Sequence, residues 1–477
     1  MRLQLTAILV LGLFAGCGDD SNHGGGSTAG SAAGGSDAGG SSAGGGDVGG
    51  GGEAPGSLFD MATIHEIEIE LSPESFAAID AEAEPIAICA YHERNYYRGN
   101  LIFDGVRYDG VGVKARGNGT ADTLGEKPSL KINLEWDDPD VPGCPEERRI
   151  EGKKKLNLIN MRQDPSFVRI PLAGELDRLV GAPQPRTSYA RLGINGQYTG
   201  IVVNSENIDR RFLAEQYPSN DGAMYEAGCS CDISEANVPA PDAEDGPLWS
   251  LDFHNGPCDT PGPSEDPLDW ELLRDFAAQV AALPPGGLYP EIGSFFDFDE
   301  FLSLWAATMF FGSGDGYFRN QNSYRIYHDP STDLFHLIDH GSADGIMRTF
   351  SDSCSADGLL VMGDQPNVFT TPDPQYDSLT ARCLAEPDCK AAYAARSWEV
   401  LHAFEGFGLE ARASELHDFI IDDMMTDPRY YYAPCVPGQS YTFPELEAHF
   451  TDYVLPWTQG RFANVRQQLE SAGYPEP

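Results

Sequence analysis

The strongest constraint on the fold is a series of alternating apolar and polar segments joined by short turns, between residues 65 and 208. Residues 97–117 alternate and contain two Asp-Gly dipeptides, and residues 189–208 contain an Asn-Gly dipeptide. Tight hairpin turns need positive φ angles, which Gly, Asn and Asp adopt most easily. These segments therefore predict antiparallel hairpins in the first half of the chain.

Other stretches with the same alternation predict further strands. Residues 65–79 alternate and then change to helical spacing, which predicts a strand, a turn and a short helix. Strands are also expected at residues 129–136 and 153–161, and a strand pair at residues 323–329 and 334–339.

Apolar residues at helical spacing predict helices mainly in the second half, at residues 166–181, 209–217, 269–283, 298–311, 388–404 and 441–473. The helix at 298–311 is the most apolar and is expected to be buried. Because strands come first and helices later, the sequence predicts an α+β fold with a sheet-rich N-terminal lobe and a helical C-terminal lobe.

The N-terminus has the features of an export signal. Arg2 is followed by an apolar run that ends at Phe14 and is too short to span a membrane. The small residues before Cys17 resemble a bacterial lipobox, which implies cleavage before Cys17 and attachment of lipid to its thiol; the alternative is an ordinary signal peptide with a chance cysteine. Residues 18–56 are mostly Gly, Ser and Ala and are expected to form a flexible tether. The folded domain is predicted to span residues 57–477.

Charge and cysteine content limit the possible partners and compartments. The chain has 31 Lys and Arg against 74 Asp and Glu, a formal net charge of −43. Such a surface repels nucleic acid and anionic membranes, so neither is expected as a direct partner. Nine of the ten cysteines remain after Cys17. In an exported protein they predict up to four disulfides and one unpaired thiol.

A basic, glycine-rich segment lies between two predicted strands. It contains four basic residues and three glycines, in an otherwise acidic chain: Lys114, Arg116, Gly117, Gly119, Gly125, Lys127 and Lys131. Glycines let backbone N–H groups approach an anion, and Lys or Arg supply the opposite charge. The segment is therefore a candidate phosphate site. The alternative is a hairpin tip with solvated lysines.

A second candidate segment carries oxygen ligands around the predicted strand pair 323–339. It follows the apolar helix and contains Asp315, Asn320, Asn322, Asp339 and Asp344. Magnesium prefers hard oxygen ligands, and an Asp followed five residues later by an Asn also occurs in the catalytic loop of protein kinases. Asp and Asn are equally typical of turns, so an ordinary solvated loop is the alternative.

Taken in order, these segments resemble the family of CotH-like kinases, which are secreted or surface-associated proteins with an atypical protein-kinase fold. The resemblance extends over about residues 65–350. It is carried by five segments, at residues 112–120, 126–134, 156–183, 192–213 and 313–347. It implies a two-lobe kinase-like fold, with lobes at about residues 57–210 and 211–477.

The resemblance also implies a site that binds ATP and Mg²⁺ or Mn²⁺. Asp315 is the implied general base, and Glu175 the ion-pair partner of the phosphate-binding lysine. The metal ligands are Asn320 or Asn322, with Asp339 or Asp344. The nucleotide would be bound by Lys114, Arg116, Gly117, Asn118, Gly119, Thr120, Lys127 or Lys131, and Glu206.

The sequence departs from the family pattern after the second strand of the pair. Members commonly have W-D-x-D there, whereas residues 338–344 contain no tryptophan and the second aspartate comes one residue late. The family pattern favours Asp344 as the metal ligand, and the position at a strand exit favours Asp339.

The predicted function is an ATP-dependent protein kinase-like phosphotransferase of the cell envelope, which acts on hydroxyl side chains of surface or coat proteins. The chain would be held at the membrane only through its lipid anchor. The alternative is a catalytically inactive surface or adhesin-type module of the same fold. Hydrolase motifs such as GxSxG and HExxH are absent. Residues 296–301 alternate acids but lack the glycine and later glutamate of an EF-hand loop.

Overall fold

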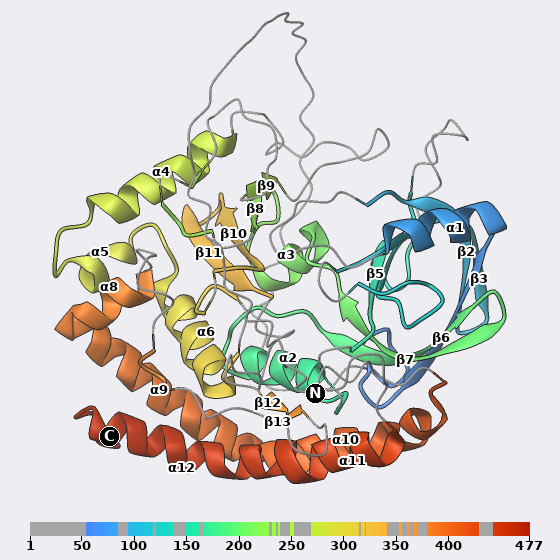
Figure 1. Ribbon diagram of the computed structural model, residues 1–477. Helices are drawn as coiled ribbons and strands as arrows, with labels where there is room; N and C mark the ends of the chain where they lie inside the picture. The colour runs from blue at the N-terminus through green and yellow to red at the C-terminus, as the bar shows by residue number, and fades with distance from the viewer. Residues whose placement is uncertain are drawn as a thin grey trace, which may run out of the picture. The chain divides into compact units, whose positions relative to one another are not determined.

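The predicted hairpins form a closed seven-stranded barrel in the computed structural model of the chain (Figure 1). The order of strands around the barrel is β1-β2-β3-β4-β5-β7-β6, and β1 closes it by pairing with β6 in parallel. All other neighbours are antiparallel. The strands are β1 (Ile64–Leu71), β2 (Tyr97–Phe103), β3 (Val106–Ala115), β4 (Leu130–Asn133), β5 (Lys155–Ile159), β6 (Thr187–Ile194) and β7 (Gln197–Glu206).

The structure describes residues 54–83, 94–117, 121–136, 148–161, 164, 166–228, 231–234, 237–238, 249–251, 269–313, 316–319, 321–340, 353–354, 360–361, 367–370, 379–428 and 442–477.

Two of the three predicted turn dipeptides join strands. Asp104 and Gly105 connect β2 to β3 with φ angles of 48° and 81°, and Asn195-Gly196 connects β6 to β7. The prediction of a turn at the third dipeptide, residues 109–110, is wrong. Gly110 lies inside β3, where its N–H donates to Asn100 Oδ1 next to a register shift in β2. The bulge requires a φ of 66° at residue 110, which glycine adopts more easily than other residues.

Alternation places one face of each barrel strand in a common core. Its buried side chains include Ile67, Ile69, Leu101, Val113, Leu130, Ile132, Leu156, Leu158 and Leu192. Leu130 and Ile132 on β4 are fully buried in this core, so Lys131 between them lies on the outer face of the barrel.

The predicted strand pair 323–339 forms part of a second, four-stranded sheet of order β11-β10-β8-β9. Its strands are β8 (Met224–Ala227), β9 (Trp249–Leu251), β10 (Tyr324–Asp329) and β11 (Leu334–Asp339). A two-stranded sheet is formed by β12 (Ser353–Cys354) and β13 (Leu360–Val361).

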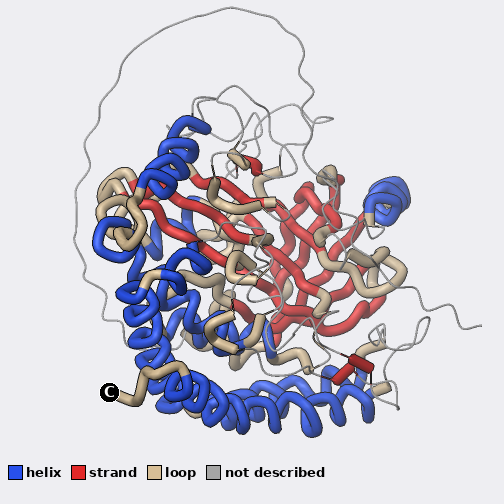
Figure 2. The backbone as a smooth tube through the Cα atoms, turned by 60° about the vertical axis from the view of Figure 1, so that its left-hand side comes forward, coloured by secondary structure: helices blue, strands red, loops and turns tan. Residues whose placement is uncertain are grey.

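Helices pack beside the sheets, and Figure 2 shows them in blue around the red strands. They are α1 (Pro73–Glu82), α2 (Arg169–Leu179), α3 (Arg210–Gln216), α4 (Asp269–Ala282), α5 (Leu288–Ile292), α6 (Phe298–Phe311), α8 (Leu379–Ala385), α9 (Pro387–Phe407), α10 (Leu409–Thr426), α11 (Phe443–His449), the π-helical turn η1 (Phe450–Val454) and α12 (Leu455–Ser471). As predicted, α6 is buried; it contacts α2, α9 and β11.

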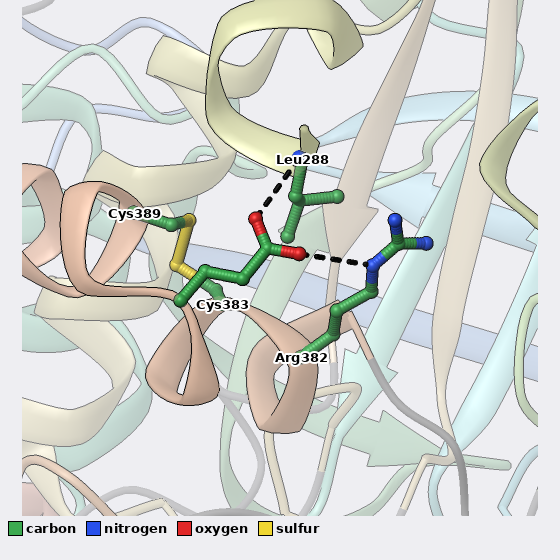
Figure 3. The surroundings of a disulfide bond; sticks show 5 residues. Leu288, Arg382, Cys383 and Cys389 are labelled. Atoms are coloured by element: carbon green, nitrogen blue, oxygen red, sulfur yellow. Dashed lines mark hydrogen bonds and ion pairs between the residues drawn. A yellow bond between two sulfur atoms is a disulfide. The ribbon is translucent and has the colours of Figure 1, made fainter. Parts of the chain in front are cut away.

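A disulfide joins Cys383 of α8 to Cys389 of α9, which agrees with the prediction of disulfides (Figure 3). Between the two cysteines, Glu386 accepts hydrogen bonds from the N–H of Leu288 and from Arg382. The disulfide and this carboxylate thus hold α5, α8 and α9 together. Cys231 is an unpaired, buried thiol.

The α+β content, the strand-rich first part and the helical last part agree with the prediction. Gly50–Pro477 is one compact unit by its contacts. None of the helices in the described residues is long and apolar enough to cross a membrane.

Candidate functional site

Asp339 is held at the exit of β11 by the turn that follows α6. Its carboxylate is fully buried and accepts a hydrogen bond of 2.9 Å from the N–H of Tyr317. Gly316 packs directly on this carboxylate with a φ of 94°, and a Cβ at residue 316 would overlap both carboxylate oxygens. Only glycine fits both the conformation and the space. The end of β11 and the turn after α6 are therefore fixed to each other.

The barrel touches the second sheet at the same point. Gln184, which lies between α2 and β6, is fully buried and donates from its side chain to the backbone oxygen of Asp339. A residue just before a barrel strand thereby contacts the last residue of β11. The segment before β6 and the exit of β11 are thus in direct contact.

Charges of both signs act on His340, the residue after Asp339, and Glu226 of β8 lies with its Oε1 3.8 Å from Nε2 of His340. Arg325 of β10 lies with Nη1 2.8 Å from Nδ1 of His340 and also pairs with Glu226. Burial lowers the pKa of His340 well below its usual value of 6.5, and the charges of Arg325, Arg116 and Lys131 lower it further. The imidazole is therefore neutral at pH 7. Arg116 and Lys131 belong to the barrel, and Arg325 to the second sheet, so charges from both sheets act on this imidazole. We call Arg116, Lys131, Arg325, Asp339 and His340 the β11-exit cluster.

Lys131 belongs to a row of polar residues across the outer face of the barrel. In the strand register, Lys114 lies opposite Lys131, Lys131 opposite Asn157, and Asn157 opposite Ser205. Asn157 is buried, and its Oδ1 has no hydrogen-bond partner among the described residues. A buried acceptor without a donor is costly, so this oxygen is available to a bound group. Lys114 also lies over the ring of Tyr96, 4.7 Å from its centre.

Lys127, the remaining basic residue of the glycine-rich segment, lies in a different environment. Lys127 is buried, forms an ion pair with Asp427 after α10, and lies 4.7 Å from the ring centre of Phe167. Asp427 also accepts a hydrogen bond of 3.1 Å from the N–H of Ile201 in β7. This arrangement ties the segment before β4 to the end of α10, and removing either charge would leave the other buried.

Glu206, the last residue of β7, lies between two cations. Lys153 is 2.5 Å and Arg186 is 2.7 Å from its Oε1. Burial alone would raise the pKa of Glu206, but the hydrogen bonds and charges of Arg186 and Lys153 lower it below its usual value. The carboxylate is therefore ionised, and it fixes the end of β7 where the chain leaves the barrel.

The predicted role of Glu175 requires a correction. Its carboxylate receives two hydrogen bonds from Arg412 of α10, at 2.6 and 2.9 Å, while Lys127 pairs with Asp427. Glu175 therefore joins α2 to α10 instead of pairing with a lysine of the glycine-rich segment. Arg412 is 237 residues away in the sequence, so no local pattern could indicate this pair.

Some of the remaining predicted site residues lie in the described part of the chain, and others do not. Gly117, with a φ of 87°, follows Arg116, and Asn322 lies in the turn before β10. The predictions for Cys17, Asn118, Gly119, Thr120, Asp315, Asn320 and Asp344 lie outside the described residues. Sequence reasoning did not include Gln184, Arg325, His340 or Asn157, because each reaches the site through contacts distant in the chain.

The β11-exit cluster fits both parts of a metal–phosphate ligand. Arg116 and Lys131 provide positive charge from the barrel for an anion, and the buried Asp339 provides a hard carboxylate ligand for Mg²⁺. Asn157 adds an unpartnered acceptor beside Lys131.

Comparison with known proteins identifies the family. The family model described as CotH kinase protein matches residues 113–449, which include strands β4 to β7 of the barrel, the second sheet and most of the helices. The chain belongs to the CotH kinase protein family.

Three curated proteins are similar over part of the chain. The inner spore coat protein H of Bacillus subtilis is 23% identical over 248 residues, which cover 52% of this chain and 62% of that protein. Spore coat protein homolog 1 of Rhizopus delemar is 23% identical over 322 residues, 64% of this chain and 48% of that protein. Invasin CotH7 of the same fungus is 24% identical over 196 residues, 39% of this chain and 30% of that protein. The chain thus spans less than two thirds of the length of each relative.

Proposed function

We propose that this chain is an ATP-dependent, protein kinase-like phosphotransferase that phosphorylates hydroxyl side chains of surface or coat proteins. One observation carries the proposal: the charges of Arg325, Arg116 and Lys131 lower the pKa of His340, which directly follows the buried Asp339. In the proposed site these cations bind phosphate and the carboxylate binds the metal. The family and the names of the spore coat relatives support the same function.

The proposed mechanism assigns separate tasks to the two sheets. Arg116, Lys114 and Lys131 neutralise the phosphates of ATP, together with backbone N–H groups of residues 117–120. Asp339 or Asp344, with Asn320 or Asn322, would hold Mg²⁺, which would supply positive charge to the phosphates. Asp315 orients the acceptor hydroxyl and accepts its proton.

The remaining predicted residues support the nucleotide site. Lys127 fixes the start of β4 through Asp427, and Glu206 holds the end of β7 close to the proposed adenine position. The proposed location is the cell envelope, outside the cytoplasm, with Cys17 as the lipid attachment site. Surface or coat proteins would be the acceptors, and the chain itself is one possible acceptor.

The test is transfer of labelled phosphate from ATP by the full chain with Mg²⁺ or Mn²⁺. Wild type should label itself or an added coat protein, and Asp315→Asn should reduce the rate by at least about 100-fold, because the general base is lost. Asp333→Asn is the matched control, since this exposed aspartate lies in the β10–β11 turn. Absence of transfer by wild type, or equal rates for wild type and Asp315→Asn, would reject the proposal.

A non-catalytic surface module is the second candidate. It is favoured by the pairing of two predicted nucleotide contacts with protein charges, Lys127 with Asp427 and Glu206 with Lys153 and Arg186. Calorimetry separates the two functions: a purely adhesive module should show no Mg²⁺-dependent affinity for ATP.

A further inference from the structure

A second polar cluster lies where α6 and β11 begin. Asp297 caps the N-terminus of α6, Glu300 is in the first turn of this helix, and His336 is on β11. One ligand atom of each residue lies within 4.8 Å of the other two. None of these residues belongs to the β11-exit cluster. The alternating acids of residues 296–301 are evident in the sequence. His336, which contacts Glu300, is 36 residues further along the chain.

The three side chains are held in place by their backbone. Asp297 donates its N–H to the oxygen of Phe335, and Phe335 donates its N–H to the oxygen of Phe295, so the strand segment before α6 is bonded to β11. Asp297 Oδ1 accepts from the N–H of Glu300, as an N-cap. Its Oδ2 is left facing His336, 3.9 Å from Nδ1.

The charges of this cluster are not balanced by protein cations. Glu300 Oε1 contacts Nδ1 of His336 at 3.3 Å and the hydroxyl of Tyr217 at 3.3 Å. In the described part of the chain, neither Asp297 nor Glu300 pairs with Lys or Arg. Two carboxylates thus share one imidazole in a site where Glu300 is 12% exposed.

His336 brings a nitrogen atom to the two carboxylates. Its side chain is 6% exposed, and its Nδ1 lies 3.3 Å from Glu300 Oε1 and 3.9 Å from Asp297 Oδ2.

The spacing suits a small divalent cation. Metal–ligand bonds of about 2.0–2.1 Å in a tetrahedron place neighbouring ligand atoms roughly 3.3 Å apart. The nitrogen–oxygen separations of 3.3 and 3.9 Å are close to this value. An imidazole ligand favours zinc over magnesium, calcium or manganese. The side chain of Asp297 is 33% exposed, so water can complete the coordination.

We infer that Asp297, Glu300 and His336 bind a divalent first-row metal ion, with zinc as the best fit, at a structural site separate from the proposed phosphotransfer site. The ion would join the start of α6 to β11. These two elements contact each other, and Gly316, which follows α6, packs on the carboxylate of Asp339 at the end of β11. Binding at the start of α6 would therefore stabilise the frame that positions Asp339.

Zinc titration of the metal-stripped full chain, without nucleotide, tests the inference. Calorimetry should find one tight zinc equivalent in wild type that is lost, or weakened at least about tenfold, in Asp297→Asn, Glu300→Gln and His336→Gln. Asn is also a good N-cap, so Asp297→Asn keeps the helix cap while it removes the charge. If His336→Gln does not fold, the two carboxylate variants decide the result.

Two controls separate this site from the rest of an acidic chain. His402→Gln removes an exposed histidine that pairs with Glu476 at 3.0 Å, and should keep the zinc equivalent. Asp339→Asn should also keep it, even if the proposed phosphotransferase function fails. Equal zinc affinity and stoichiometry in wild type, Asp297→Asn and Glu300→Gln would overturn the inference.

Discussion

The two ends of β11 lie in different polar environments. At its exit, Asp339 and His340 are accompanied by three cationic residues from two sheets. Near its start, roughly 10 Å away along the strand, His336 faces two carboxylates with no Lys or Arg partner in the described residues. The difference is the basis of both proposals: an anion that carries a metal at the exit, and a bare cation at the start.

The largest effect is expected from Asp339→Asn. Loss of the carboxylate should reduce phosphate transfer at least about 100-fold, because the metal loses a charged ligand. The asparagine can still accept the hydrogen bond from Tyr317, so the fold should survive. Transfer assays with thermal unfolding as a check test this. Unchanged transfer would identify Asp344 as the ligand, or remove the exit from the mechanism.

A smaller effect is expected from Lys131→Met. The variant removes one phosphate-facing charge and keeps a similar apolar stem, so the Kd for Mg²⁺–ATP should rise about tenfold. Lys390→Met is the matched control, since this lysine lies over Phe369 on the helical side. The zinc equivalent at the start of β11 should be the same in both variants. Equal Kd values for Lys131→Met and the control would contradict the proposal that the exit of β11 binds an anion.

The pKa of His340 offers a subtler test. Because its folded pKa lies below 6.5, the folded chain binds fewer protons than the unfolded chain, and stability falls as pH drops below 6.5 towards the folded pKa. A bound phosphate would offset the nearby positive charges and raise the pKa. NMR titration should show a rise of about one unit on adding ATP, since one unit corresponds to about 1.4 kcal/mol of interaction. The exposed His402 should not shift; a shift of both would indicate a non-specific effect.

The smallest effect on the two ends of β11 is expected from removal of the disulfide. Replacing Cys383 and Cys389 by serine should lower the unfolding free energy by about 2 kcal/mol, since the closed loop is short. The disulfide joins α8 to α9 near α5, so transfer activity well below the unfolding temperature should stay within about twofold of wild type. Chemical denaturation and transfer assays measure the two quantities. A large loss of transfer would mean that the helical region controls the β11 exit.

The sequence predicted those elements whose signals are local. The turns at Asp104-Gly105 and Asn195-Gly196 have the positive φ angles that their residue types suggest, and α6 is apolar enough to be recognised as buried. The dipeptide at residues 109–110 has the same signal but forms a bulge, because pairing with β2 continues through it. Parallel closure of the barrel by β1 and β6 depends on a pairing that no local pattern encodes.

The candidate site was predictable only in its charged components. Lys131 and Asp339 were predicted from their chemistry. In the structure His340 follows Asp339, and the charge of Lys131 helps to lower the pKa of His340. Gln184 and Arg325 were missed, because their roles depend on contacts across 155 and 15 residues. Glu175 was assigned to a lysine because it follows the basic segment, whereas packing of α2 against α10 gives it Arg412.

The most direct test of the central claim is anomalous diffraction from crystals soaked with Mn²⁺ and a non-hydrolysable ATP analogue. The account predicts a Mn²⁺ peak at coordination distance from the Asp339 or Asp344 carboxylate, with the phosphates between that metal and Arg116 and Lys131. A nucleotide bound elsewhere, or Mn²⁺ found only at Asp297, Glu300 and His336, would contradict it.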